Sequence, residues 1–124
     1  MLPISQPGRA VSAGSQSAHR RHPRHQLATP LYLWRRRGNG AAIPGIALEI
    51  SASGISVILP EQLDLGEEVE FAIQLPGGQL RTTAVVRNKT MFRYGFEFAA
   101  PTASQQQLIH ESCASLPLYS GPEY

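Results

Sequence analysis

A stretch of strict alternation at residues 68–75 limits the possible folds of this chain more than any other feature. One face of it carries Val69, Phe71, Ile73 and Leu75, and the other carries Glu68, Glu70 and Gln74. A period of two residues is typical of a half-buried β-strand. Pro76-Gly77-Gly78 follows as a turn, and the range 80–87 reads as the returning strand. This region is therefore predicted to form a β-hairpin.

Four further segments show the same period and are also predicted to be strands. They cover residues 27–34, 46–51, 55–59 and 92–98. Six short strands at a spacing of roughly 8 to 12 residues are typical of an antiparallel barrel or sandwich. Asn88-Lys89-Thr90 is predicted to turn the chain before the last strand. The aromatic face expected on that strand consists of Phe92, Tyr94, Phe96 and Phe98.

The period changes to that of a helix after Pro101. Thr102 with Gln105, or Ser104 with Gln107, has the spacing of a capping box. Pro117 is expected to stop the helix, which is predicted to cover one end or one open side of the β-structure. The residues that share its apolar face are Leu108, Ile109, Cys113 and Leu116.

The charge of the chain is distributed unevenly along its 124 residues. Residues 1–48 hold seven arginines and no acidic residue, whereas residues 49–124 hold four cations and nine acidic residues. This asymmetry indicates a local site for an anion and not a broad nucleic-acid surface. The single cysteine, Cys113, fits a reducing compartment, and no segment has the length and hydropathy of a membrane span or secretory signal. A cytoplasmic protein without membrane insertion is expected.

Low content of bulky apolar residues predicts that residues 1–18 form a disordered tail. The folded domain is predicted over residues 19–118, and residues 119–124 are expected to be a short C-terminal tail. Two polar motifs lie within this domain. The first is Arg20-Arg21-His22-Pro23-Arg24, and the second is Glu49-Ile50-Ser51-Ala52-Ser53-Gly54.

The pair of motifs resembles the PilZ family of bacterial cyclic di-GMP receptor domains. An R-x-x-x-R arm is followed in that family, about one hairpin later, by a [D/N]-x-S-x-x-G turn. Arg20 and Arg24 match the arm, Ser51 and Gly54 match the turn, and Glu49 stands where the family has Asp or Asn. The resemblance extends over about residues 19–116. It implies an all-β fold, namely a six-stranded antiparallel β-barrel of the split-barrel type with a C-terminal α-helix and a disordered N-terminal arm.

The resemblance also implies that cyclic di-GMP is the ligand and that the protein is not an enzyme. The implied ligand-binding residues are Arg20, Arg21, Arg24, Glu49, Ser51 and Gly54. Arginine suits this ligand because its planar fork can bind a phosphate or the guanine O6 and N7 atoms, and can stack on a base. A carboxylate at Glu49 can accept the guanine N1–H and N2–H₂ donors together. Binding is expected to rearrange the arm and so to signal to an unidentified effector protein.

Other interpretations remain open at this point. The domain could be a degenerate member of the family that binds no nucleotide and acts through protein contacts. A third interpretation is a single-stranded nucleic-acid binder with a basic arm, although the aromatic strand offers it little positive charge. His19, His22 and His25 lack Cys or acidic partners nearby, so neither a metal site nor a cofactor is expected. No catalytic motif is found.

Overall fold

The computed structural model describes residues 22–119, and the predicted hairpin forms one wall of the molecule. Strands β4 (Glu68–Leu75) and β5 (Gly78–Thr90) pair antiparallel around a turn at Pro76 and Gly77. The four large apolar residues of β4, Val69, Phe71, Ile73 and Leu75, point into the core and are at most 2% exposed. The alternation in the sequence therefore identified both the strand and its buried face.

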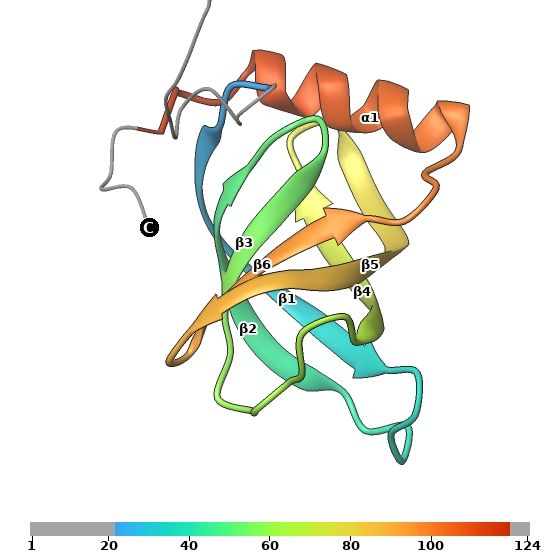
Figure 1. The fold of residues 1–124 in the computed structure, drawn as a ribbon. Helices are drawn as coiled ribbons and strands as arrows, with labels where there is room; N and C mark the ends of the chain where they lie inside the picture. Colours follow the sequence, from blue (N-terminus) through green and yellow to red (C-terminus); the bar gives the residue numbers. More distant parts are fainter. Residues whose placement is uncertain (1–21, 120–124) are drawn as a thin grey trace, which may run out of the picture.

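Four more strands close this wall into a barrel. They are β1 (His25–Arg35), β2 (Ile43–Ile50), β3 (Gly54–Ile58) and β6 (Arg93–Phe98). All neighbours are antiparallel, and the order around the barrel is β1-β2-β3-β6-β5-β4 (Figure 1). Pairing of β1 with β4 completes the closure, so none of the six strands within residues 22–119 presents a free edge over its whole length. The predicted all-β fold, a six-stranded antiparallel barrel with a C-terminal helix, is confirmed.

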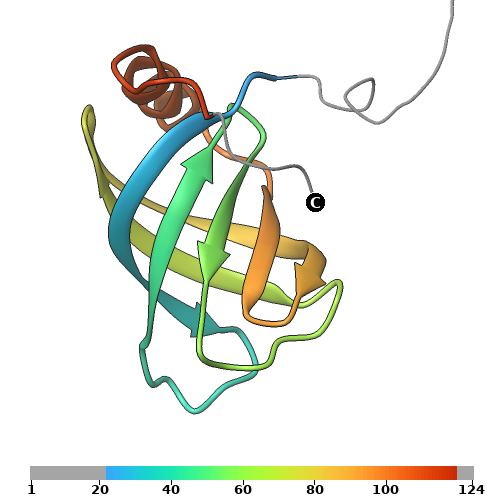
Figure 2. The ribbon, with the colours of Figure 1, turned by 90° about the vertical axis from the view of Figure 1, so that its left-hand side faces the viewer.

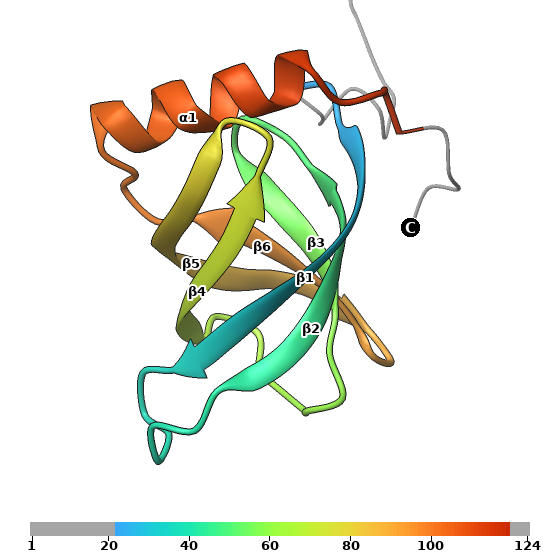
Figure 3. The same cartoon turned by 180° about the vertical axis from the view of Figure 1, so that it is seen from behind.

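Helix α1 (Ala103–Ala114) lies across one end of the barrel (Figures 1 and 3). Thr102 and Gln105 form the capping box, so the first of the two predicted spacings is the one used. Ile109 and Cys113 enter the core, and Ser112 Oγ accepts a 3.0 Å bond from Gly77 N in the β4–β5 turn. Among residues 22–119, no helix is long and apolar enough to cross a bilayer.

The connection between β3 and β4 closes the opposite end of the barrel. Leu59 and Leu63 are completely buried there. The hydroxyl of Tyr94 accepts a bond from Leu63 N at 3.1 Å and donates to Glu61 O at 2.9 Å. The side chains that close both ends join those inside the barrel in one hydrophobic core.

Two expectations for the second half of the sheet were wrong. Asn88-Lys89-Thr90 continues β5, and the chain turns at Met91 and Phe92 instead. Met91 has a positive φ of 54°, and a register shift at Arg87 changes the alternation before the turn. Phe92 is consequently 52% exposed, whereas Tyr94, Phe96 and Phe98 are buried as predicted.

The outer wall carries one aromatic–cation contact away from the ends of the barrel. Trp34 on β1 lies beneath the guanidinium of Arg81 on β5, with the Cζ atom 4.7 Å from the ring centroid. Arg81 also pairs with Glu70 at 3.1 Å on the intervening strand β4. The contact therefore spans three neighbouring strands of the wall.

The predicted disordered tail at residues 1–18 lies outside the described residues. The predicted domain boundaries stay a prediction. At the other end of the chain, residues 117–119 run beside the start of β1 (Figure 2). Gln26 N donates to Pro117 O at 2.7 Å, and Tyr119 N donates to Arg24 O at 2.8 Å.

Candidate functional site

The turn between β2 and β3 is held by the hydroxyl of Ser51. Its Oγ accepts bonds from Ser53 N at 3.2 Å and Gly54 N at 3.3 Å, while Ser51 N donates to Gly54 O at 2.9 Å. A Cβ on Gly54 would lie 2.2 Å from the carbonyl oxygen of Phe96 on β6. Gly54 is therefore required by the close approach of two backbones and not by a positive φ.

A β-bulge directs Glu49 toward this turn. Ala47 pairs with Val57 and Glu49 with Ser56, so Leu48 is an extra residue in the β2–β3 ladder. The ladder of β1 with β2 shifts register at the same place. Bulges re-aim side chains relative to the regular pleat. As a result Glu49 is only 2% exposed, although it lies on an outer strand surface of the barrel.

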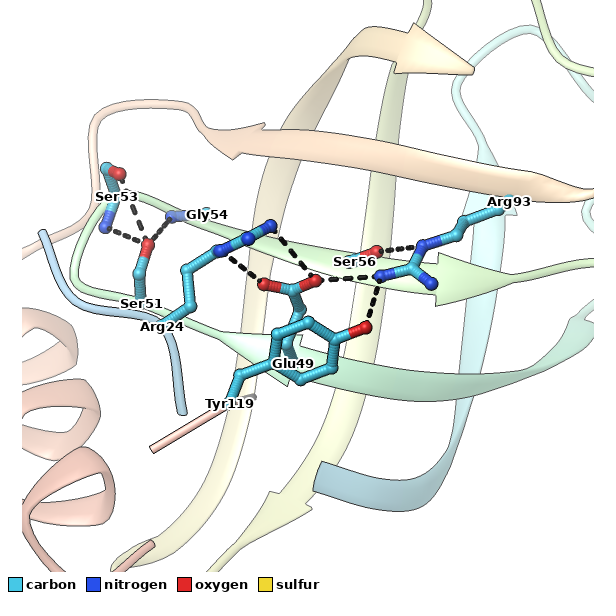
Figure 4. A network of polar contacts seen from close by, with 8 residues as sticks. All are labelled: Arg24, Glu49, Ser51, Ser53, Gly54, Ser56, Arg93 and Tyr119. Atoms are coloured by element: carbon cyan, nitrogen blue, oxygen red, sulfur yellow. Dashed lines mark hydrogen bonds and ion pairs between the residues drawn. The ribbon is translucent and has the colours of Figure 1, made fainter. Parts of the chain in front are cut away.

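The buried carboxylate of Glu49 lies between two arginines (Figure 4). Arg24 Nε is 2.9 Å from Oε1, and its Nη1 donates to Oε2 at 3.2 Å. Arg93 Nη2 donates to Oε2 at 2.8 Å from the other side. Desolvation offsets much of the attraction within such a cluster, but removing one partner of a buried pair costs about 3–5 kcal/mol. The carboxylate therefore holds both guanidinium groups in place.

Tyr119 covers the two arginines. Its ring centroid lies 5.2 Å from Cζ of Arg24 and 5.9 Å from Cζ of Arg93. Its hydroxyl accepts a 3.3 Å bond from Arg93 Nη2. The C-terminal segment thus contributes an aromatic face to the cluster formed by Arg24, Glu49 and Arg93.

A cavity of about 400 Å³ opens beside this cluster. Arg24, Glu49, Ser51 and Gly54 all line it, so the structure brings these four predicted site residues together around one space. Arg20 and Arg21, the other two predicted site residues, lie outside the described residues. The assignment of all six residues to ligand binding stays a prediction.

Strands β5 and β6 form the far wall of the cavity through Arg87, Asn88, Gly95 and Glu97. Asn88 lies directly over Gly95, where a Cβ would be 2.5 Å from Asn88 Oδ1. Arg87 and Glu97 form an exposed ion pair of 2.6 Å at the rim. The cavity thus combines two arginines, two carboxylates, an amide and hydroxyl groups, a set that can bind a polar ligand.

Two residues of the site, Arg93 in the cluster and Tyr119 over it, were not predicted from the sequence. Alternation predicts that Arg93 shares its face of β6 with Gly95 and Glu97, but it does not indicate that β6 pairs with β3 beside the site. No sequence signal pointed to Tyr119. Within residues 22–119, no group of three or more His, Cys, Asp or Glu side chains is arranged to hold a metal ion.

The sequence model of the PilZ domain family matches residues 18–115. The chain belongs to the PilZ domain family. The match covers the whole barrel and α1, in agreement with the resemblance seen in the two motifs. No curated protein sequence matches this PilZ domain closely enough to count as a relative.

Solved structures share the fold of this PilZ domain at low sequence identity. The PilZ domain of YcgR from Escherichia coli, described with c-di-GMP, matches with a TM-score of 0.66 at 13% identity, covering 79% of this chain and 91% of that one. The PilZ domain of CeSA from a cellulose-synthesizing bacterium matches with a TM-score of 0.60 at 18% identity, covering 73% and 94%. The Bacillus subtilis inhibitor of motility MotI/DgrA matches with a TM-score of 0.63 at 25% identity, covering 77% of this chain and 50% of that one.

Proposed function

We propose that this PilZ domain is a receptor for cyclic di-GMP, which it binds with Arg20, Arg21, Arg24, Glu49, Ser51 and Gly54. The observation that carries the proposal is that Arg24 of the first motif lines one cavity with Glu49, Ser51 and Gly54 of the second, its Nε lying 2.9 Å from Oε1 of Glu49. The similar PilZ domain of YcgR is described with c-di-GMP, which supports the same ligand class here.

The chemistry of the cavity agrees with this ligand. Cyclic di-GMP carries two ionised phosphates and two guanine bases. Arg24 offers a planar fork for a phosphate or a guanine edge, and Ser51 lies at the wall of the same cavity. The arm on which Arg20 and Arg24 lie would fold over the ligand, and its rearrangement would alter the surface that an effector protein meets.

Calorimetric titration of the purified domain with cyclic di-GMP tests the proposal. Arg24→Ala is expected to lose about 1.5–3 kcal/mol of binding free energy, roughly 10- to 150-fold in Kd, because it removes charge-assisted bonds. Arg36→Ala is the matched control, since Arg36 is exposed and its ion pair with Glu68 is 3.8 Å long. Equal affinities of wild type and Arg24→Ala would reject Arg24 as a ligand contact.

The second candidate is a PilZ domain that binds no nucleotide and acts through protein contacts. It is favoured by one observation: the carboxylate of Glu49 is already bound by Arg24 and Arg93. Absence of heat with millimolar cyclic di-GMP at low salt would support this candidate. Binding of oligonucleotides with a steep salt dependence would instead support a nucleic-acid binder.

A further inference from the structure

A second β-bulge, in β5, turns Asn88 to the outside of the barrel. Val86 is buried in the core, and the two-residue period of a strand would direct Asn88 inward as well. Arg87, between them, is an extra residue in the β5–β6 ladder, as Leu48 is in the β2–β3 ladder. The bulge therefore places Asn88 on the outer face, where it pairs with Gly95. The two bulges produce one row across β2, β3, β6 and β5, which consists of Glu49, Ser56, Gly95 and Asn88.

The amide of Asn88 lies in the space that Gly95 leaves open. A Cβ on Gly95 would be 2.5 Å from Oδ1, 2.7 Å from Nδ2 and 2.9 Å from Cγ of Asn88. Both polar atoms are nearer to this position than the carbon that carries them, so the polar edge of the amide extends over Gly95. Gly95 and Asn88 both line the cavity. The amide oxygen and nitrogen are therefore presented at the cavity wall.

Asn88 keeps its hydrogen-bonding capacity for a ligand, whereas the charged groups around it are paired. Its side chain forms no hydrogen bond with any other residue of the range 22–119. Arg87 pairs with Glu97 at 2.6 Å, and Lys89 Nζ donates to Leu63 O at 2.7 Å. The charges at this end of the cavity are thus compensated, and an uncharged amide is the group that remains to recognise a ligand.

A side-chain amide suits the edge of a guanine base. It carries an acceptor beside a donor, and guanine presents its O6 acceptor next to its N1–H donor. Building on the proposed function, we propose that Asn88 binds a guanine of cyclic di-GMP, with Nδ2 donating to O6 and Oδ1 accepting from N1–H. Phosphates bind best to cations, which Arg24 supplies in the same cavity. Asn88 belongs to neither motif and adds a base subsite on β5.

Calorimetric titration with cyclic di-GMP tests the contact. Asn88→Ala is expected to weaken binding at least about fivefold, because a bidentate contact with a base is lost. Asn39→Ala is the matched control, since Asn39 is exposed between β1 and β2 and lines a different cavity. It is expected to bind within about twofold of wild type. Equal affinities of wild type and Asn88→Ala would overturn the proposal.

An analogue of the ligand identifies the edge that Asn88 contacts. Cyclic di-IMP lacks the guanine N2–H₂ groups but keeps O6 and N1–H, the two atoms assigned to the amide. A carboxylate at position 88 would instead accept from N1–H and N2–H₂ together. The ratio of the Kd for cyclic di-IMP to that for cyclic di-GMP is therefore expected to rise at least about fivefold from wild type to Asn88→Asp.

The same ratio separates base contact from a structural role. Asn39→Asp introduces the same charge elsewhere and should leave the ratio unchanged. An unchanged ratio in Asn88→Asp would overturn the assigned contact, because a structural role would affect both ligands equally. Asn88 is exposed, so its variants are expected to fold as wild type does, which urea unfolding verifies.

NMR of wild type with a mononucleotide distinguishes failure of this proposal from failure of the proposed function. If cyclic di-GMP gives no binding heat, the receptor function fails, and millimolar GMP still tests the base subsite. The side-chain NH₂ signals of Asn88, assigned by triple-resonance spectra, are expected to shift with GMP, while those of Asn39 stay in place. Asn88 signals that move with neither GMP nor cyclic di-GMP would overturn the proposal, even in a domain that binds the dinucleotide.

Discussion

Gly54 allows the turn at residues 51–54 to pack directly against β6. The turn that carries Ser51 packs closely against β6. The backbone of Phe96 occupies the space where a side chain at position 54 would lie. Phe98 N also donates to Ser53 O at 3.0 Å, which ties the same turn to the end of β6. The geometry of the turn is therefore set by contact with β6 as well as by its own hydrogen bonds.

Gly54→Ala should destabilise the domain by about 1–3 kcal/mol, because the new Cβ would meet a backbone oxygen that cannot move aside easily. Urea unfolding at neutral pH measures the change. Ala52→Ser is the control, since Ala52 is exposed on the same turn and should change stability by less than about 0.5 kcal/mol. A Gly54→Ala protein as stable as the control would show that β3 and β6 can separate without loss.

Residue patterns alone could indicate only the local part of the candidate site, and Arg24 was added to it by the resemblance of the two motifs to the PilZ family. Ser51 and Gly54 share one turn, and their spacing is visible in the chain. Arg93 reaches the site because β6 pairs with β3, and Tyr119 because the C-terminal segment lies along the start of β1. Both contacts join residues far apart in the sequence. The burial of Glu49 was equally hidden, since it depends on a bulge at Leu48.

At the scale of elements, α1 closes the barrel and is fixed by its own first turn. Thr102 Oγ1 accepts from Gln105 N at 3.1 Å, and Gln105 Oε1 accepts from Thr102 N at 3.0 Å. Gln105 also donates to Arg81 O on β5 at 2.8 Å and accepts from Thr82. The capping box thus determines where the helix begins and also attaches it to the barrel.

Thr102→Ala should cost about 0.5–2 kcal/mol of stability, because it leaves the Gln105 N–H without its cap. Ser104→Ala is the matched control: Ser104 is exposed within the helix, where alanine is favourable, so no loss is expected. Both free energies come from urea unfolding followed by circular dichroism. A larger loss in Ser104→Ala than in Thr102→Ala would contradict the assigned start of the helix.

Elements with regular periodicity were predictable, and those that depend on irregular backbone were not. β4 follows its period without interruption and was located correctly. The start of α1 was located by its capping box, whereas the helix ends at Ala114, before the expected stop at Pro117, and leaves Leu116 outside it. The end of β5 was missed because the register shifts at Arg87 and the chain turns at Met91, a residue rarely found at a positive φ. Asn88 is of a residue type typical of turns, but it lies inside β5 and over Gly95.

At the scale of the whole molecule, a bidentate ion pair joins the end of β1 to the segment before β4. Arg35 Nε donates to Glu67 Oε2 at 2.6 Å and Nη2 to Oε1 at 3.0 Å. Burial acts to raise the pKa of Glu67, but the bonds from Arg35 and from Asp64 N outweigh it, so this pKa is lowered from its ordinary value. The bond to Glu67, opposed by burial, raises the pKa of Arg35.

The lowered pKa of Glu67 predicts an acid-dependent loss of stability. Its contribution is present in full above the ordinary carboxyl pKa and is lost as the pH falls through the lower pKa of the folded state. Glu67→Gln should therefore be less stable than wild type at pH 7, by about 0.5–1.5 kcal/mol, and the difference should shrink toward pH 3. Urea unfolding at both pH values measures this. Glu68→Gln, whose pair with Arg36 is long and exposed, should show little difference at either pH.

The contact between Trp34 and Arg81 determines what an optical experiment on this protein can report. Trp34 is the only tryptophan of the chain, and ten residues of extended strand, roughly 30 Å, separate it from Arg24. Indole emission will therefore respond to changes in the guanidinium above the ring and not to occupancy of the cavity beside Glu49. A titration followed by intrinsic fluorescence is expected to stay flat even at saturation, and a dye attached near the turn at residues 51–54 would be the informative label.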